Sequence, residues 1–389
     1  MLENNLINDF KKYFHEDNDA VYFSPGRINI IGEHIDYNGG HVMPMAISLG
    51  VTGVIKWTDK PIINIVSIDI SDKIYTIDMN DYAKTNDYLD YIRGILYFFK
   101  EDNHIKNYDK GMDIYLSSTL PASSGLSSSA AIELLFSHII NDYYECNLSN
   151  LDLVYLSLNS ERKYIGVNCG IMDQFAIGMS EVNKVIYLDT NSIEYNFVPF
   201  SLKDKELVII NTKKPRNLVE SKYNERRSEC EKVRDLLNKK YNKSSLCKYS
   251  IEELDSIKDL ITNAEYKRSY HAITEEARVQ KAIMALNSGD LPLLGELLKA
   301  SHESLQNDYE VSGIELDTIC SFLNNNKYCL GARMTGAGFG GCAIALFDTN
   351  NHDIICNVIK ELKIEYNKKT NLNLEYYFVK SSDKTHKVI

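Results

Sequence analysis

The most concentrated set of chemically active side chains lies between Ser24 and His41. These eighteen residues contain six ionisable side chains, two side-chain amides and four glycines. Four of the side chains can donate or accept several hydrogen bonds at once, namely Arg27, Glu33, His34 and Asp36. Such a set suits the binding of a small polyhydroxylated molecule through its separate hydroxyl groups. The alternative is a solvated surface β-hairpin, for which Asn38-Gly39 is a strong turn signal.

A serine-rich loop follows a short strand expected at residues 112–116 and precedes a helix expected over about residues 128–143. Small residues let the backbone approach a ligand closely, and a helix N-terminus offers free N–H groups to an anion. The residues of this candidate phosphate cradle are Ser123, Ser124, Gly125, Leu126, Ser127, Ser128 and Ser129. It is not a Walker A loop, because no lysine follows the glycine. The alternative is a structural loop in which a serine caps the helix.

Asp173 is a single carboxylate between apolar neighbours in the segment 170–175. Partial burial suits a carboxylate to abstract a proton, unless a cation holds it ionised, and Arg27 is the candidate cation. Taken alone, Asp173 would more often be a helix cap. Glu161, twelve residues earlier, would be a solvated residue near the end of a helix that opens at Ser149 with a capping box and runs to about Tyr164.

A glycine pattern of the form G-x-G-x-x-G occurs at Gly336, Gly338 and Gly341. An apolar strand follows it where a dinucleotide-binding fingerprint requires a helix, so that class of site is excluded. A structural hairpin turn remains the alternative. Tyr223 falls early in a charged helix, where a tyrosine usually faces the core.

These segments together resemble the galactokinases, members of the GHMP superfamily of small-molecule kinases. Residues 24–41 resemble the N-terminal signature of that family, and the serine loop, residues 170–175 and residues 333–342 resemble its other motifs. The resemblance implies that the serine loop wraps the triphosphate of ATP, that Ser129 and Glu161 hold Mg²⁺, and that Asp173 is the catalytic base beside Arg27. It further implies a sugar site of Glu33, His34, Asp36 and Tyr223, and, by weaker alignment, a nucleotide contact at Ser67.

The activity that the resemblance implies is transfer of a phosphoryl group from ATP to the anomeric hydroxyl of α-D-galactose, giving galactose 1-phosphate and ADP. Ile35 stands where many bacterial members have Thr and resembles N-acetylgalactosamine kinases, whereas Asn38 favours galactose. Kinases of mevalonate or homoserine lack the Glu33-His34-Ile35-Asp36 pattern. A catalytically dead galactose sensor is a further alternative, although such sensors usually carry lesions in the serine loop.

Composition limits the partners and the compartment. A net charge of −11 with no basic stripe argues against nucleic acid. The eight cysteines form no C-x-x-C pair, which is typical of a reducing compartment. We find no signal peptide and no apolar run of about 18 residues. The sequence therefore predicts a cytoplasmic enzyme without membrane contact, a monomer or weak homo-oligomer, whose partners are galactose and ATP.

The elements that must position these residues indicate an α+β protein. We expect strands between residues 45 and 80 and a helix over 88–99. Further strands are expected at 185–188 and 207–210, followed by long helices over 218–238 and 275–307 and a return to strands only at 342–347 and 374–379. The length of 389 residues favours two domains, which we divide into 1–185 and 186–389. The resemblance implies an S5-like N-terminal domain, a ferredoxin-like C-terminal domain and an active site in the cleft between them.

Overall fold

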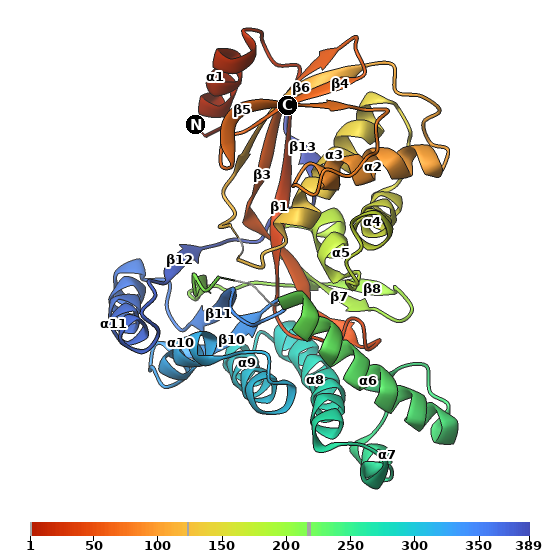
Figure 1. Cartoon of the computed structure of the whole chain (residues 1–389). Coiled ribbons are helices and arrows are strands. Elements are labelled where there is room, and N and C mark those ends of the chain that lie inside the picture. The colour runs from red at the N-terminus through yellow and green to blue at the C-terminus, as the bar shows by residue number, and fades with distance from the viewer. Residues whose placement is uncertain (1, 123, 216–218) are drawn as a thin grey trace.

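A six-stranded sheet forms the half of the molecule that holds both chain ends, at the top of Figure 1. The computed structural model describes residues 2–122, 124–215 and 219–389. The strands lie in the order β13-β1-β3-β6-β4-β5, and all neighbours are antiparallel except β4 and β6. Their bounds are β1 (Ala20–Asn29), β3 (Pro44–Thr58), β4 (Ile62–Ser67), β5 (Ser71–Asp78), β6 (Gly111–Ser118) and β13 (His386–Lys387).

Helices cover both faces of this sheet. The amphipathic helix α1 packs on one face, where Phe10 joins Val21 and Val54, which lie opposite each other in β1 and β3. The other helices pack on the opposite face. Because both faces are covered, β1 is buried along almost its whole length. The helices are α1 (Leu2–Phe14), α2 (Asp90–Glu101), α3 (Ser128–Tyr143), α4 (Asn150–Asn159) and α5 (Met172–Met179).

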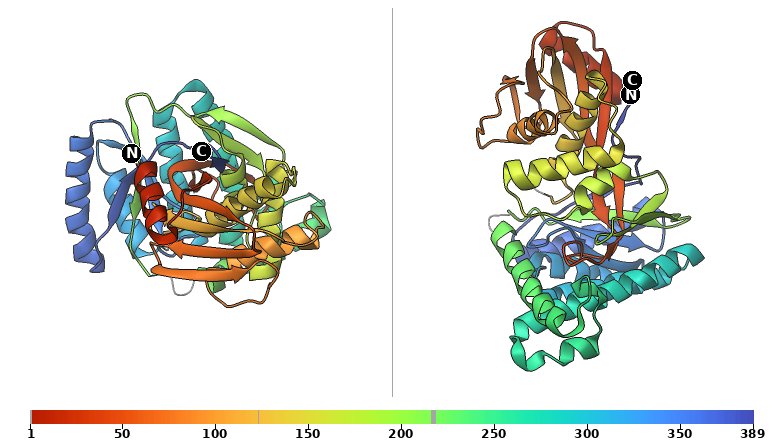
Figure 2. Two further views of the ribbon diagram at one scale, coloured as in Figure 1. Left: turned by 90° about the horizontal axis from the view of Figure 1, so that it is seen from above. Right: turned by 90° about the vertical axis from the view of Figure 1, so that its right-hand side faces the viewer.

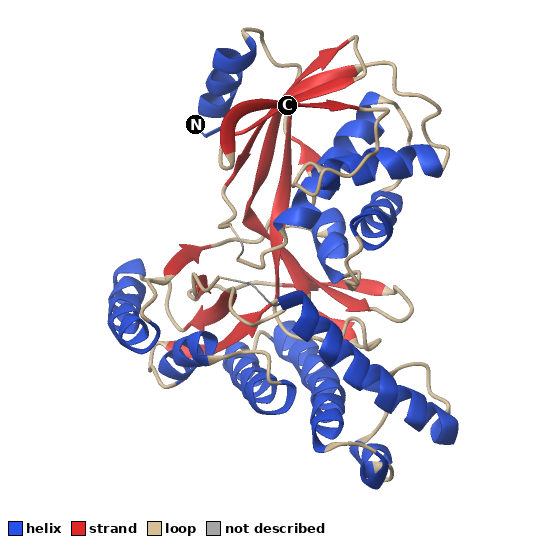
Figure 3. Cartoon of the chain, in the orientation of Figure 1, coloured by secondary structure: helices blue, strands red, loops and turns tan. Residues whose placement is uncertain are grey.

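A four-stranded antiparallel sheet in the order β10-β11-β9-β12 forms the second half. The sheet faces the first half and its helices lie on the far side (Figure 3). A small sheet, β2-β7-β8, lies at the junction. The strands are β2 (His41–Val42), β7 (Lys184–Asp189), β8 (Tyr195–Pro199), β9 (Glu206–Asn211), β10 (Cys329–Thr335), β11 (Cys342–Phe347) and β12 (Glu375–Phe378). The helices are α6 (Val219–Tyr241), α7 (Ile251–Asp255), α8 (Asn263–Ser288), α9 (Leu291–Ser304), α10 (Ile314–Asn324) and α11 (His352–Thr370).

Two sequence expectations about helices are corrected. The single helix expected over 275–307 is two helices, because Gly289 ends α8 at a positive φ of 70° and Asp290 caps the start of α9. The helix that Ser149 opens does have the expected capping box. It stops being α-helical at Asn159, however, and continues as a π-helical turn, Ser160–Ile165, which carries Glu161.

The last residues of the chain return to the first sheet. In β13, Lys387 pairs with Tyr22 of β1, and the backbone N–H of Val21 donates to the carbonyl of Ile389. Both ends of the chain therefore lie together, as the turned views show (Figure 2). We retain the division near residue 185 as a proposal, with this terminal segment assigned to the N-terminal half. Within the described ranges, no helix is long and apolar enough to cross a membrane.

Candidate active site

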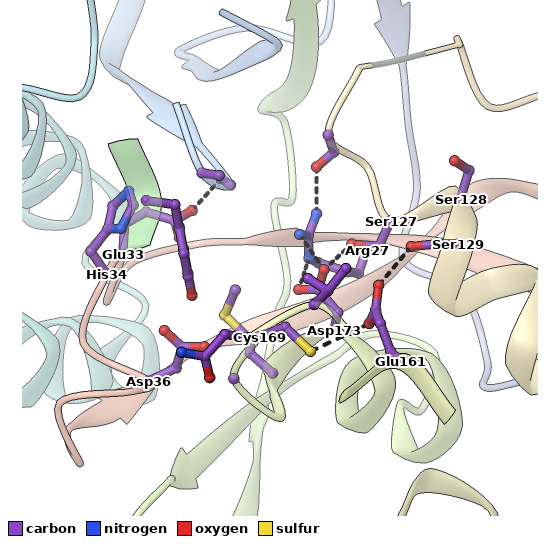
Figure 4. A pocket seen from close by; sticks show the side chains of 18 of the residues that line it. Arg27, Glu33, His34, Asp36, Ser127, Ser128, Ser129, Glu161, Cys169 and Asp173 are labelled. Carbon is purple, nitrogen blue, oxygen red and sulfur yellow. Dashed lines mark hydrogen bonds and ion pairs between the residues drawn. The ribbon is translucent and has the colours of Figure 1, made fainter. Parts of the chain in front are cut away.

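A cavity of about 440 Å³ collects residues from both halves of the chain (Figure 4). Glu33 and His34 lie on one side of it, and Arg27, Asp173 and the serine loop lie on the other. The second half adds the start of α6, with Tyr223, and the turn between β10 and β11, with Gly336. The glycine pattern is therefore a β-hairpin turn that also forms part of the cavity wall.

Arg27 and Asp173 form a two-point ion pair in this cavity. Arg27 Nε donates to Asp173 Oδ1 and Nη2 donates to Oδ2, each at 2.8 Å. The Arg27 side chain is 6% exposed, whereas that of Asp173 is 34% exposed. Ser127 Oγ also donates to Asp173 Oδ2. The carboxylate is thus fixed in orientation and still accessible from the cavity, as a base or an orienting group must be.

The serine loop is hydrogen-bonded to Arg27. Arg27 Nη1 donates to the carbonyl of Gly125 at 2.7 Å, and the Arg27 backbone N–H donates to the carbonyl of Leu126 at 3.2 Å. Ser127 stands at the N-cap of α3 with a φ of 62° but makes no side-chain cap bond, because its hydroxyl is directed to Asp173. Among the described residues, no N-cap side chain therefore occupies the N–H groups in the first turn of α3, which an anion site can use.

Not every predicted loop residue reaches the cavity. Gly125, Ser127, Ser128 and Ser129 line it. Ser124 and Leu126 are buried and do not, since Leu126 joins the hydrophobic core. Ser123 lies outside the described residues.

Glu161 lies beside Ser129, its partner in the Mg²⁺ site that the family resemblance implies. Ser129 Oγ donates to Glu161 Oε1 at 3.2 Å. Behind them Gln174 Nε2 donates to Glu161 Oε2 and, at 3.3 Å, to Oε2 of the fully buried Glu133. Burial, reinforced by the charge of Asp173, raises the pKa of Glu161. A cation bound here would neutralise the buried Glu161 carboxylate. Its ligands would be the oxygen atoms of Ser129 and Glu161, which suit a hard cation.

Glu33 is held by the glycine-loop segment of the other half. Its Oε1 accepts hydrogen bonds from Arg333 Nη2 at 2.6 Å, Gly336 N at 2.7 Å and Thr335 Oγ1 at 3.1 Å. Arg333 is wholly buried. Three donors on one oxygen leave the second carboxylate oxygen of Glu33 as the one available to a ligand.

Helix α8 contacts the segment that carries Gly32 and Glu33. Glu275, also wholly buried, accepts the backbone N–H of Gly32 at 3.0 Å and of Glu33 at 3.3 Å through its Oε1. Its Oε2 pairs with Arg278 Nε at 2.6 Å. Despite burial, the charges of Arg278, His271 and Arg333 lower the pKa of Glu275 to about 2. The turn at Gly32 is thus held by a carboxylate of α8 that is itself paired with Arg278.

His34 is buried and Asp36 is half-buried, and their pKa values shift in opposite directions. Burial lowers the pKa of His34 to about 3, so its ring is neutral. Burial, with the nearby charges of Asp173 and Glu33, raises the pKa of Asp36 to about 7. Asp36 lies against Gly170, where an added Cβ would come within 1.7 Å of Asp36 Oδ2. Gly170 therefore makes room for the Asp36 carboxylate at the cavity wall.

The remaining two predicted site residues differ in position. Tyr223 lines the cavity, and its ring centroid lies 5.7 Å from that of His34. Ser67 is buried at the end of β4, where it pairs with Leu116 of β6, and it is not among the residues that line the cavity.

Several supporting residues escaped the sequence analysis. Glu133 lies four residues after Ser129 on the same face of α3, so helical spacing could have signalled it. Helical spacing gives no such signal for Gln174, because it follows Asp173 directly. Arg333 opens the glycine-loop segment and could have been suspected as the partner of Glu33. Sequence spacing gives no signal for Glu275, which lies on a helix more than two hundred residues away from the segment it supports.

Comparisons with family models and with curated proteins give matches along most of the chain. The galactokinase galactose-binding signature matches residues 8–56, and the N-terminal and C-terminal domains of GHMP kinases match residues 90–181 and 282–364. The chain is 41% identical over 389 residues to a galactokinase of Clostridium beijerinckii, with 99% of each chain covered. It is 43% identical to a galactokinase of Enterococcus faecalis over the full length of both.

Solved structures show the same relationship. The galactokinase of Lactococcus lactis complexed with galactose matches with a TM-score of 0.93 and 39% identity, covering 100% of both chains. The mevalonate kinase of Methanococcus jannaschii shares the fold, with a TM-score of 0.68 at 20% identity over 93% of this chain and 98% of that one. The two-domain GHMP fold expected from the sequence is confirmed.

Proposed function

We propose a residue-level mechanism for a chain that belongs to the galactokinase family of the GHMP kinases. The enzyme phosphorylates galactose at the expense of ATP. The observation that carries the mechanism is the two-point pair of Arg27 and Asp173, which fixes a carboxylate at the junction of the serine loop and the sugar signature.

Asp173 accepts the proton of the anomeric hydroxyl as that oxygen attacks the γ-phosphoryl group. The guanidinium of Arg27 orients the Asp173 carboxylate at two points and stabilises negative charge on the phosphoryl group during transfer. Ser127 holds the Asp173 carboxylate through Oδ2. Phosphoryl transfer proceeds through a loose transition state, so orientation of the hydroxyl by Asp173 contributes along with proton removal.

The sugar site consists of Glu33, His34, Asp36 and Tyr223. Carboxylates accept hydrogen bonds from sugar hydroxyls, and the neutral ring of His34 supplies a nitrogen that can complement them. The buried partners of Glu33 hold its carboxylate in one orientation, so the site is formed before the sugar arrives.

ATP binds with its phosphates at the serine loop and at the N-terminus of α3, through Gly125, Ser127, Ser128 and Ser129. We assign Mg²⁺ to Ser129 and Glu161, because both present oxygen ligands to the cavity and Mg²⁺ is usually held by one or two carboxylates together with substrate phosphates. Mg²⁺ would neutralise charge on the β and γ phosphate oxygens. Ser67 and the buried Ser124 and Leu126 remain weaker nucleotide assignments.

The N-acetylgalactosamine alternative loses its motivating observation. Ile35, the residue that suggested it, is wholly buried and does not line the cavity. An added Cβ at Gly40 would meet Ile35 Cδ1 at 2.9 Å, so Ile35 points toward Gly40 and the core. Asn38 is likewise buried, and its side-chain amide donates to the carbonyl of His34 at 2.8 Å. Both residues therefore support the backbone of residues 34–40 without lining the cavity.

Product analysis tests the function directly. The purified enzyme with galactose, ATP and Mg²⁺ should give one sugar phosphate whose phosphorus couples to the anomeric proton in ³¹P NMR. A phosphate on another carbon, or no sugar phosphate from active and folded protein, would contradict the proposal. A cytoplasmic location and a monomeric or weakly associated state stay predictions, which cell fractionation and sedimentation can check.

A further inference from the structure

A chain of two tyrosine hydroxyl groups and one thiol leads from the core of the second half to His34. Tyr37 Oη lies 2.8 Å from His34 Nδ1 and 2.9 Å from Tyr309 Oη, and Tyr309 Oη lies 3.4 Å from Cys230 Sγ. Tyr309 and Cys230 are wholly buried. None of the hydroxyl groups in this chain lines the cavity, whereas His34 does.

The far side of the His34 ring has a different environment. His34 Nε2 is buried and makes no hydrogen bond of normal geometry to any residue in the described ranges. The ring is neutral because burial lowers its pKa to about 3, so it carries one N–H, and the position of that proton decides whether Nε2 donates or accepts.

Two directions of hydrogen-bond donation are possible along the hydroxyl chain, and one of them is favoured. If Nδ1 carried the proton, Tyr37 would accept from it and donate to Tyr309, and Tyr309 would have to donate to the sulfur of Cys230, a weak acceptor. In the reverse direction Tyr309 donates to Tyr37, and Tyr37 donates to the basic lone pair of Nδ1. The second arrangement makes the stronger hydrogen bonds, so the ring proton belongs on Nε2.

We propose that Tyr37 and Tyr309 are positioning residues that hold His34 in the tautomer with its proton on Nε2, so that His34 offers the cavity a hydrogen-bond donor among the carboxylates of Glu33 and Asp36. Because Nε2 is buried in this structure, it reaches a sugar hydroxyl only when the His34 ring or the adjoining wall shifts on binding. The hydroxyl then donates to a carboxylate while its oxygen accepts from Nε2. The ligand class is therefore a sugar hydroxyl, and this role rests on the proposed sugar site.

The tautomer can be read without turnover. In uniformly ¹⁵N-labelled enzyme without substrates at neutral pH, long-range ¹H–¹⁵N spectra should show His34 with a protonated Nε2 and an unprotonated Nδ1. Signals absent from the His34→Gln variant identify the residue. A protonated Nδ1 in the wild-type enzyme overturns the proposal, whether or not galactose proves to be the substrate.

Variants that remove single hydroxyl groups test the positioning role. Tyr37→Phe should shift the His34 signals and raise the KM for galactose about 5- to 30-fold, as for the loss of one hydrogen bond, with the KM for ATP unchanged. Tyr309→Phe, one step farther away, should act in the same direction with a smaller effect. If neither variant alters the His34 signals or the sugar KM, the proposal fails.

The matched control is Tyr108→Phe. Tyr108 is buried in the first half, and its hydroxyl donates to the carbonyl of Leu96 at 2.8 Å. This variant should lower the melting temperature but leave the His34 signals and the sugar KM unchanged. A rise in sugar KM equal to that of Tyr37→Phe would show a general effect of lost stability and would contradict a specific role for the hydroxyl chain.

Discussion

Arg27 and Asp173, one at the end of β1 and the other in the first turn of α5, face each other with both nitrogen–oxygen distances at 2.8 Å. A guanidinium can form this two-point contact and still donate from a third nitrogen, here to the carbonyl of Gly125. The pair therefore connects the carboxylate that we assign as the base directly to the loop that we assign to the phosphates of ATP.

Asp173→Ala should abolish turnover and leave ATP binding within a few-fold of the wild-type value. The carboxylate is needed for chemistry, since a positioned base contributes roughly 10²- to 10⁴-fold, but it is not needed to hold the nucleotide. Steady-state kinetics and calorimetric ATP titration measure the two effects. Retention of more than about a tenth of the wild-type kcat would contradict the role of Asp173 as a base.

Arg27→Lys should lower kcat by roughly 10²-fold while the positive charge is kept. An ammonium group cannot hold Asp173 at two points and Gly125 at a third, so the carboxylate loses its fixed orientation. Kinetics at saturating galactose and ATP measure the change. A lysine variant with nearly wild-type kcat would show that charge alone, without the two-point geometry, is sufficient.

Gly170→Ala should raise the KM for galactose by displacing Asp36, whose Oδ2 would lie 1.7 Å from the new Cβ. Asp36→Ala should raise the same KM by one to two orders of magnitude, because it leaves sugar hydroxyls unpaired. The double variant tests the link. If Gly170 acts through Asp36, adding Gly170→Ala to Asp36→Ala has little further effect, whereas fully additive changes would show that Gly170 acts elsewhere.

The pKa of Asp36 predicts a pH dependence of stability. Burial and the charges of Asp173 and Glu33 raise that pKa to about 7, well above its ordinary value of 3.8. Between these values the folded protein keeps a proton that the unfolded chain has lost, so this group makes stability fall as pH rises from about 4 to 7. Asp36→Asn should therefore melt at a higher temperature than the wild-type protein at pH 8, and the difference should shrink toward pH 4.

Thermal unfolding without ligands, at constant ionic strength, measures this dependence. The exposed Asp72 in β5 provides the control, since Asp72→Asn removes a charge without removing a buried group. A difference between Asp36→Asn and wild type that is the same at all pH values would show that Asp36 does not titrate in this window.

Sequence reasoning succeeded where local pattern carries the information. The helix after the serine loop was expected over residues 128–143 and spans that range, because small residues precede a long run of good helix formers. Arg27 was named as the cation for Asp173 from residue type alone, and the structure shows the pair. Local patterning and residue type were sufficient for these two predictions.

Other features depend on contacts between distant residues. Strand β10 was missed, because its buried Arg333 reads as a polar interruption until Glu33, three hundred residues earlier, supplies the partner. The π-helical turn that carries Glu161 has no local sequence signal. The hydroxyl chain behind His34 joins Tyr37 to Tyr309 across the two halves, and only the folded structure brings them together.

Substrate choice is the most direct test of the account. Galactose and glucose differ in the orientation of the C4 hydroxyl, and a site built to hydrogen-bond one orientation can reject the other by roughly 10⁴-fold. With ATP and Mg²⁺, and with ADP release as the readout, galactose should be phosphorylated efficiently, glucose almost not at all and N-acetylgalactosamine poorly. A higher kcat/KM for N-acetylgalactosamine than for galactose would contradict the assignment.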